Sequence, residues 1–392
     1  MQRPIYLDHH ATTPVAPEVL AAMLPYFTEA FGNASSLGHA YGWEAQAAID
    51  GAREAIAAAI HASPEELIFT SGATEANNLA IKGVAEAYFH QGRHLITVAT
   101  EHRAVLEPCA YLESLGFEVT YLPVESDGRL DLDQLAAAIR PDTVLVSVMA
   151  ANNEIGVLQP LAEIGALCRS RQVLFHTDAA QALGKIPLDV EAMSIDLMSL
   201  TAHKLYGPKG VGALYVRRRQ PRVQLAAQLQ GGGQERELRA GTLYTPQIVG
   251  FGAAVGLSLQ EMASETTRLG QLRDRLLAQL QTLGDVWLNG HPSQRLPGNL
   301  NVTIRGLDGA ALLLALQGTV ALSSGSACSQ NRPSHVLQAL GRSESEAKAS
   351  LRLGLGRQTT AAEVDQVAAV IVAAVRSLRQ HDGCVSTSSP TG

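Results

Sequence analysis

Between residues 67 and 216 the sequence alternates short apolar runs with longer amphipathic segments, and this alternation restricts the possible folds more than any other feature. Apolar runs that can be buried on both faces, joined by helix-length segments, are typical of a parallel sheet covered by helices on both sides. We expect helices at 77–90, 104–115 and 161–171, and strands at 67–70, 94–99, 118–122, 143–148, 173–177, 196–201 and 212–216. The connection at 207–212 is too short for a helix, so one end of the sheet is expected to be antiparallel.

The segments outside this region predict further helices and a second unit. Helical spacing of apolar residues predicts helices at 17–31 and 40–61. From about residue 245 a long helix is expected to reach 283, followed by strands at 286–288, 299–302 and 351–353 and a helix at 361–378. The fold class is therefore α/β: a mostly parallel sheet sandwiched by helices, with a smaller α+β C-terminal domain.

The composition excludes several classes of protein. With 46% apolar and 17% charged residues, the chain of 392 residues can bury a large core and is not disordered. Its net charge of −7 provides no basic surface for stable nucleic-acid binding. The longest apolar run, 367–375, is about half of the roughly 20 residues that span a bilayer. Because the first residues also lack an apolar signal core, we expect a soluble, cytoplasmic protein.

The four cysteines are widely spaced and form no C-x-x-C pair, which argues against disulfides and against a structural metal site. Cys109 and Cys168 fall on apolar helical positions and are expected to be inert core thiols, whereas Cys384 lies in the polar tail. Cys328 lies in SSGSACSQNRPS, a stretch too small and polar to form a core. An exposed thiol of this kind is either a liability or a nucleophile.

A phosphate site is one interpretation of the motif SGATE at 71–75, between a predicted strand and a predicted helix. A strand that turns through glycine into a helix presents free N–H groups and a positive dipole end, which suits an anion. Thr74 would add a hydroxyl. A simple helix cap explains the motif equally well. The motif is not G-x-G-x-x-G and no acidic residue follows at the usual distance, which disfavours a dinucleotide.

Two further strand ends carry groups that complement a phosphate site. Asp178 follows the strand at 173–177, where a buried carboxylate needs a cation or proton donor, although a solvated loop position explains it as well. Lys204 follows an apolar strand, and desolvation there would lower the pKa of its amine, as a Schiff base requires. Lys209 lies among Gly and Pro residues and is expected to be better solvated. The other three lysines are interpreted as surface cations: Lys82, Lys185 and Lys348.

An anion site, a strand-end carboxylate and a strand-end amine together are the groups that bind pyridoxal 5′-phosphate. His102 follows a third strand end. A lone histidine is more often a hydrogen-bonded loop residue, but an imidazole there could stack on a planar cofactor and move protons. Arg352 lies between leucines in a strand, where it would either face outward or, if fixed by a partner, grip a substrate carboxylate.

The order and spacing of these motifs resemble the cysteine desulfurases of the iron-sulfur-cluster and nitrogen-fixation type, on the class V aminotransferase fold. This is the pyridoxal-phosphate-dependent transferase fold of type I. The likeness extends from Tyr6 to Thr360 through YLDHHATTP, SGATEANNLAIKG, TEH, NNEIG, HTDAAQ, HKLYGPKG, AGT, SSGSAC and GRQTT. It implies an enzyme that takes sulfur from L-cysteine, releases L-alanine and keeps the sulfur as a persulfide for iron-sulfur cluster assembly or other thiolation pathways.

The resemblance also implies a role for each motif residue. Lys204 would bind the cofactor aldehyde, His102 would stack on its ring, and Cys328 would be the nucleophile that takes the sulfur. Asp178 would pair with the pyridine nitrogen of the cofactor. Its phosphate would be bound by Thr74, Thr201 and His203, together with Thr242 from a neighbouring subunit. Further contacts to the cofactor would come from Ala73, Asn153 and Gln181. The substrate would be held by Arg352, through its carboxylate, and by Asn153. No metal is implied.

The organisation of this family predicts the domain limits and the partners. We expect a large cofactor domain over 15–255, a small domain made of 1–14 and 256–380 that carries the Cys328 loop, and an unstructured tail over 381–392. An active homodimer and a sulfur-acceptor protein, either an iron-sulfur scaffold or a thiolation protein, are also implied.

The four residues between Cys328 and Pro333 make the loop slightly shorter than in long-loop members. The alternatives are an aminotransferase or selenocysteine lyase on the same fold, and a non-catalytic sulfur-relay protein.

Overall fold

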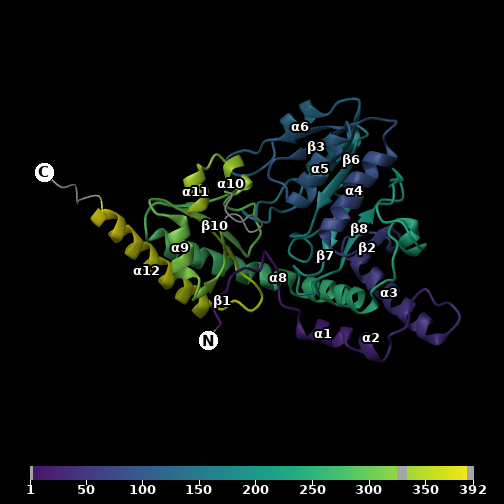
Figure 1. Ribbon diagram of the computed structural model, residues 1–392, viewed down its shortest axis with the longest axis horizontal. Coiled ribbons are helices and arrows are strands. Elements are labelled where there is room, and N and C mark those ends of the chain that lie inside the picture. Colours follow the sequence, from purple (N-terminus) through teal and green to yellow (C-terminus); the bar gives the residue numbers. More distant parts are fainter. Residues whose placement is uncertain (1–2, 325–332, 386–392) are drawn as a thin grey trace.

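The computed structural model describes residues 3–324 and 333–385, and its largest element is a seven-stranded sheet (Figure 1). In spatial order the strands are β2 (Leu67–Thr70), β8 (Gly212–Val216), β7 (Leu197–Thr201), β6 (Leu174–Asp178), β5 (Thr143–Ser147), β3 (His94–Val98) and β4 (Glu118–Leu122). The strands from β7 to β4 run parallel, whereas β8 is antiparallel to both of its neighbours. The expected α/β class and antiparallel end are confirmed, and every strand limit of this seven-stranded sheet lies within one residue of its expected position.

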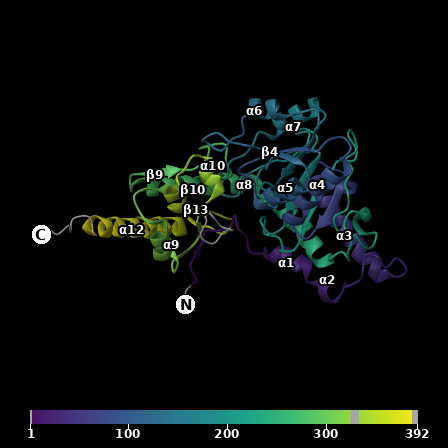
Figure 2. The same ribbon diagram turned by 45° about the horizontal axis from the view of Figure 1, so that its top comes forward.

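Helices cover both faces of this sheet, as Figure 1 and Figure 2 show. Ile68 packs with α4 (Ala73–Ala87) and α5 (Arg103–Ser114), whereas Phe69 packs in the core formed with α3 (Ala40–Ala58), α6 (Leu132–Ala138) and α7 (Leu161–Ser170). Neighbouring residues enter different cores because successive strand side chains point to opposite faces. Short 3₁₀ turns, η1 (Pro64–Glu66) and η2 (Gln234–Glu237), lie in the connections.

The helix expected at 17–31 is two short helices, α1 (Pro17–Met23) and α2 (Pro25–Thr28). The break falls at Pro25, which lacks a backbone N–H and whose ring opposes a continuous helix. Helix α4 also differs from expectation, because it begins at Ala73 rather than at residue 77. The SGATE motif therefore leads directly into the first turn of this helix.

The second unit contains a four-stranded antiparallel sheet in the order β12 (Ser323–Ser324), β13 (Ser350–Gly354), β10 (Asn299–Ile304) and β9 (Val286–Leu288). A separate parallel pair joins β1 (Ile5–Tyr6) to β11 (Val320–Ala321). The helices of this unit are α9 (Gly309–Leu316), α10 (His335–Ala339), α11 (Glu344–Lys348) and α12 (Ala361–Val385). Figure 2 shows this unit beside the large sheet, joined to it by α8 (Thr245–Gln281). The smaller α+β unit is thus present as expected.

Helix α8 contributes to two separate cores. Phe251 and Val255 near its start pack under the large sheet, whereas Leu276 and Leu280 near its end pack in the second unit. Leu7 belongs to the second core as well. On this division of the apolar core we propose the domain limits 15–255 and 1–14 with 256–380.

The end of the chain differs from the expected helix at 361–378. Helix α12 continues to Val385, so the first residues of the tail predicted to be unstructured are helical. The remainder of that prediction, 386–392, lies outside the described residues. None of the described helices combines the length and apolar character needed to cross a membrane.

Candidate active site

A cavity of about 520 Å³ lies where five strands of the large sheet end. Strand β2 runs in the same direction as β7, because both are antiparallel to β8, and Thr70 and Thr201 flank Gly212 in register. The carboxyl ends of β2, β3, β5, β6 and β7 therefore meet at one edge, where α/β proteins place their ligands. The cavity is lined by these predicted site residues: Ala73, Thr74, His102, Asn153, Asp178, Gln181, Thr201, His203, Lys204 and Arg352.

Two predicted site residues are not part of this lining. Thr242 is exposed and lies outside the cavity of its own chain. Cys328 lies outside the described residues. The structure therefore brings together ten of the predicted positions from two units that are far apart in the sequence.

The first turn of α4 forms one wall of the cavity and offers unpaired backbone N–H groups. Gly72 precedes the helix with φ +151°, a conformation that glycine adopts at little cost, and no side chain caps the helix. A Cβ at Gly212 on the neighbouring strand would lie 2.7 Å from the Gly72 Cα, so glycine is required for this close approach. An uncapped N-terminus suits an anion. The motif does supply the N-cap residue, Gly72, but without a side-chain cap the first N–H groups of the helix stay available to a ligand.

Asp178 is the last residue of β6 and is 5% exposed. Its Oδ2 accepts a 2.7 Å hydrogen bond from Asn77 Nδ2, and its Oδ1 accepts a 2.9 Å bond from the N–H of Ala180. The carboxylate is thus fixed and buried, and the solvated-loop interpretation is wrong. Sequence reasoning missed Asn77, whose signal was a polar residue on the buried, otherwise apolar face of α4.

The two lysines of the cavity differ in burial: Lys204 is half-buried and Lys209 is exposed. Beside Lys204, the Nδ1 of His203 lies 3.1 Å from the Thr12 hydroxyl. Burial and the positive charge of Lys204 lower the pKa of His203 to about 4. His203 is therefore a neutral ring at physiological pH, able to donate or accept a hydrogen bond without a charge of its own.

His102 occupies the N-cap position of α5 and is half-buried. Its Nδ1 accepts a 3.1 Å hydrogen bond from the N–H of Ala104, so the neutral ring carries its proton on Nε2. Burial, and next the positive charge of Lys204, lower the pKa of His102 below its usual value. The ring is thus held neutral, with its tautomer set by the helix terminus.

Arg352 enters the cavity from β13 of the second unit and is 2% exposed. Its Nη2 donates 2.9 Å hydrogen bonds to Asp8 Oδ1 and Ser323 Oγ, and its Nη1 donates a 3.0 Å bond to the carbonyl of Asn153. Arg352 Nε and Asn153 Oδ1 are buried without a partner among the described residues. The outward-facing interpretation of Arg352 is therefore wrong, and two polar atoms remain for a ligand.

Three sequence-based interpretations concern residues outside this lining. The thiols of Cys109 and Cys168 are buried, and burial raises the pKa of each to about 12, as expected of inert core cysteines. Lys348 is exposed as predicted. Lys185 is not a surface cation: it is half-buried, and its Nζ donates a 2.9 Å hydrogen bond to Gln181 Oε1. That interpretation of Lys185 is corrected because the turn after β6 folds the side chain inward.

The donor set of the cavity fits pyridoxal phosphate. It combines an uncapped helix N-terminus for a phosphate, a buried carboxylate for a protonated ring nitrogen and a strand-end amine for an aldehyde. The unpaired buried atoms of Arg352 and Asn153 provide further partners for a polar ligand. Together the sheet and the cavity define a pyridoxal-phosphate-dependent transferase fold of type I.

Comparison with known proteins narrows this class. The aminotransferase class-V family matches residues 5–367. "Cysteine desulfurase IscS" of Methylococcus capsulatus is 54% identical over 382 residues, covering 97% of this chain and 94% of that protein. The cysteine desulfurase of Homo sapiens is 55% identical over 381 residues, covering 96% and 83%.

Solved structures agree with these relatives. A "NifS-like protein" superposes with a TM-score of 0.90 at 37% identity, covering 96% of this chain and 100% of that one. "SspA in complex with cysteine" superposes with a TM-score of 0.80 at 41% identity, covering 90% and 98%. The chain belongs to the class-V aminotransferase family and, within it, to the cysteine desulfurases. The resemblance inferred from the motifs is confirmed.

Proposed function

We propose that this chain uses pyridoxal phosphate to remove sulfur from L-cysteine, releasing L-alanine and carrying the sulfur as a persulfide on Cys328. One observation supports this most strongly: Lys204, Asp178 and the uncapped first turn of α4 line one cavity with a fixed guanidinium, that of Arg352. The near-complete coverage of relatives named cysteine desulfurase supports the same reaction.

The cofactor would be held by residues already in place. Its phosphate would bind the N–H groups at Ala73 and Thr74 together with Thr201 and His203, and Asp178 would pair with the ring nitrogen. Lys204 would form the covalent bond, while Asn153, Gln181 and the His102 ring would contact the remainder. When bound, the cofactor supplies an electron sink for the bonds at the substrate α-carbon.

Arg352 is suited to hold the substrate carboxylate. Its two Nη groups donate hydrogen bonds to Asp8, Ser323 and the Asn153 carbonyl, and these bonds fix the guanidinium plane. The unpaired Nε–H and the one remaining Nη1 proton are left to bind a carboxylate oxygen, with the fixed positive charge adding to each hydrogen bond. The substrate would therefore enter with its carboxylate toward the second unit and its amine toward Lys204.

Cys328 is proposed as the nucleophile because the described residues on either side of its segment lie beside the cavity. Ser323 contacts Arg352 directly, and Ser334 Oγ donates to Glu154 Oε2, next to Asn153. Cys328 follows Ser324 by four positions in the sequence, which limits their Cα separation to about 14 Å. The thiolate would form an S–S bond with the substrate sulfur as the C–S bond breaks. The electron pair stays with the carbon skeleton, which takes a proton and leaves as alanine.

Protein loaded with pyridoxal phosphate is expected to convert L-cysteine to L-alanine and to gain one sulfur atom on the peptide that contains Cys328. Amino-acid analysis measures the alanine, and mass spectrometry of peptides prepared without reductant locates the sulfur. Equal amounts of alanine and transferred sulfur are expected. Release of a keto acid instead of alanine would identify an aminotransferase, and alanine from selenocysteine alone would identify a selenocysteine lyase.

A homodimer would complete the site, because Thr242 is exposed and does not reach the cavity of its own chain. Large apolar side chains are exposed around the same region. They come from α1, α2, the connection between α2 and α3, the start of α3 and the residue before α8: Leu20, Leu24, Phe27, Phe31, Leu37, Tyr41, Trp43 and Tyr244. Two ring pairs, Phe27 with Tyr244 and Phe31 with Tyr41, extend across this surface. An exposed apolar surface of this kind is typical of a protein interface.

Mixed dimers test whether Thr242 acts on the neighbouring site. Thr242→Ala is expected to weaken cofactor binding about 10-fold by removing one hydrogen bond to the phosphate. When a Thr242→Ala subunit is paired with a Lys204→Ala subunit, its intact Lys204 faces the partner's intact Thr242, and wild-type affinity should return. The dissociation constant is measured by absorbance titration of differently tagged, co-purified subunits. Affinity that stays weak would place Thr242 at the site of its own chain.

The sulfur would pass to an acceptor protein, either an iron-sulfur scaffold or a thiolation protein, and we place the reaction in the cytoplasm.

A further inference from the structure

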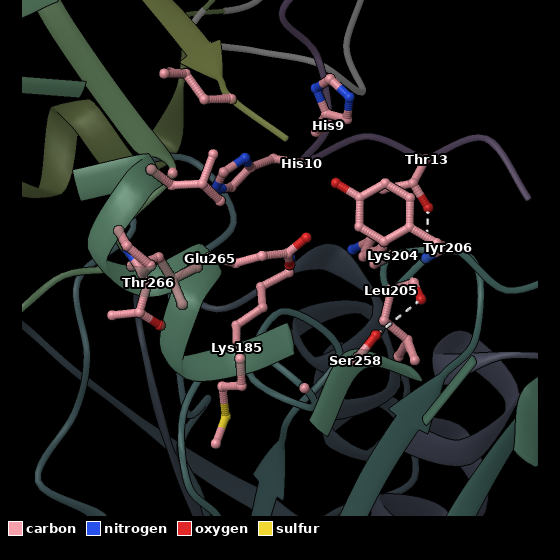
Figure 3. Close-up of a pocket in the computed structure, with 17 residues that line it drawn as sticks. His9, His10, Thr13, Lys185, Lys204, Leu205, Tyr206, Ser258, Glu265 and Thr266 are labelled. Atoms are coloured by element: carbon pink, nitrogen blue, oxygen red, sulfur yellow. Dashed lines mark hydrogen bonds between the residues drawn. The ribbon is translucent and has the colours of Figure 1, made fainter. Parts of the chain in front are cut away.

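Lys185 lies behind the active-site cavity, on the wall of a smaller pocket of about 40 Å³ (Figure 3). Lys204 and His10 line this pocket too, and His10 also lines the large cavity. Lys185 follows β6 by seven residues, in the turn that begins with Asp178 and carries Gln181. A second lysine is thus placed next to the proposed catalytic amine without entering the large cavity.

The contacts of Lys185 lead to the large cavity through one side chain. Lys185 Nζ donates a 2.9 Å hydrogen bond to Gln181 Oε1, and Gln181 Nε2 donates a 2.8 Å bond to the His10 carbonyl. Gln181 is 2% exposed and lines the large cavity. Because a primary amide has two N–H groups, one remains for a ligand after the bond to His10.

We propose that Lys185 is a positioning residue: by holding Oε1 it fixes the Gln181 amide so that nitrogen, not oxygen, is presented to an anionic oxygen of the bound cofactor or substrate. The inference rests on the proposed function for the identity of that ligand. The two ends of a glutamine amide are nearly equal in shape, so hydrogen-bond partners decide its orientation. Without Lys185 the His10 carbonyl alone would hold the amide, so the population of turned amides that present a lone pair to the anion would rise.

The charges around Lys185 argue against a purely structural role. Glu265 lines the same small pocket, but its carboxylate is paired with Arg357. Among the described residues Lys185 makes no ion pair, and its amine is bonded to a neutral amide instead. Burying an amine without a carboxylate costs free energy that an apolar side chain of the same length would not. If Lys185 served packing alone, a methionine at this position would not lower the free energy of unfolding.

The bond to Gln181 does not depend on the charge of the amine. Burial, and next the positive charge of Lys204, lower the pKa of Lys185 to about 7, with Glu265 opposing this effect. A neutral amine still carries two N–H groups and an ammonium three, so a donor faces Oε1 in either state. The orientation of Gln181 is therefore maintained throughout the neutral pH range.

The test measures how tightly cofactor-free protein binds pyridoxal phosphate, together with the position of the visible absorption band that forms. Lys185→Met should raise the dissociation constant about 10- to 100-fold. It should also shift the band, because the hydrogen bond from the Gln181 amide to the anionic oxygen of the ligand is lost. Lys185→Arg, which keeps a donor, should stay within about threefold of wild type. Lys348→Met, at an exposed lysine bonded to Glu344, is the matched control and should change neither quantity.

A double-mutant cycle separates positioning from a general structural effect. Once Gln181→Leu has removed the amide, adding Lys185→Met should change the dissociation constant by less than about threefold. Melting temperatures of the cofactor-free variants are compared first, and Lys185→Gln replaces Lys185→Met if the latter does not fold.

Two results would overturn the inference: an unchanged constant and band in Lys185→Met, or full additivity with Gln181→Leu. Wild-type protein that takes up no pyridoxal phosphate would instead refute the proposed function together with this inference.

Discussion

Lys204→Ala is expected to abolish the visible absorption band of protein loaded with pyridoxal phosphate and to reduce alanine formation from cysteine at least about 10³-fold. Lys204 follows β7 at the edge where the carboxylate of Asp178 and the first turn of α4 also lie. It is the more buried of the two lysines in that cavity. Removing its amine takes away both the covalent bond to the cofactor and a base beside the substrate.

The matched control for this prediction is Lys209→Ala, in the same cavity but exposed. It should keep the absorption band and lose less than about 10-fold in alanine formation, because an exposed amine retains its solvent. Borohydride reduction followed by peptide mapping should place the cofactor on the peptide with Lys204. A band that survives in Lys204→Ala, or a label found at Lys209, would contradict the assignment.

Cys328→Ser is expected to bind the cofactor normally, form the visible band and yet lose at least about 10³-fold in alanine formation, with no sulfur retained on the protein. A serine hydroxyl cannot accept sulfur as a persulfide. Of the other cysteines, Cys109 and Cys168 are buried and their thiols, with a pKa of about 12, hold a negligible thiolate fraction at neutral pH. Neither can replace Cys328 as the nucleophile.

Cys384→Ser is the control for this variant, since Cys384 is the one other cysteine not assigned to the core. It should leave alanine formation and the transferred sulfur at wild-type levels, as measured by amino-acid analysis and mass spectrometry. Full alanine formation by Cys328→Ser would mean that another group removes the sulfur. Sulfur mapped to Cys384 would identify that group.

The strands and their ends were readable from local pattern. Runs such as 67–70 and 212–216 are mostly apolar, which is the pattern of burial on both faces; they are buried over their whole length, and their limits agree with the structure. Because parallel strands end at one edge, the positions after them, including His102 and Lys204, could be assigned to one site. The helices were located less well: α4 begins four residues early because Gly72 and Ala73 enter it through a glycine conformation that no periodicity reveals.

The motif residues that would bind the cofactor could likewise be predicted from the sequence, and the order of the motifs identified the family. Their partners were not. Asn77 holds Asp178 from a distance of 101 residues, and Asp8 holds Arg352 from a distance of 344. Such pairs depend on which faces and units meet, which local pattern does not encode.

Lys185 shows the difference most clearly. Its position in a turn before Pro187 is typical of an exposed residue, and this local pattern predicts a surface cation. In the folded chain the turn after β6 packs against His10 and helix α8, and the amine points to Gln181. Amino-acid order thus specifies the sheet, its edge and the chemistry gathered there, because these follow from periodicity and strand direction. Burial, hydrogen-bond partners and the orientation of each group follow from contacts between distant segments, which exist only once both units have packed.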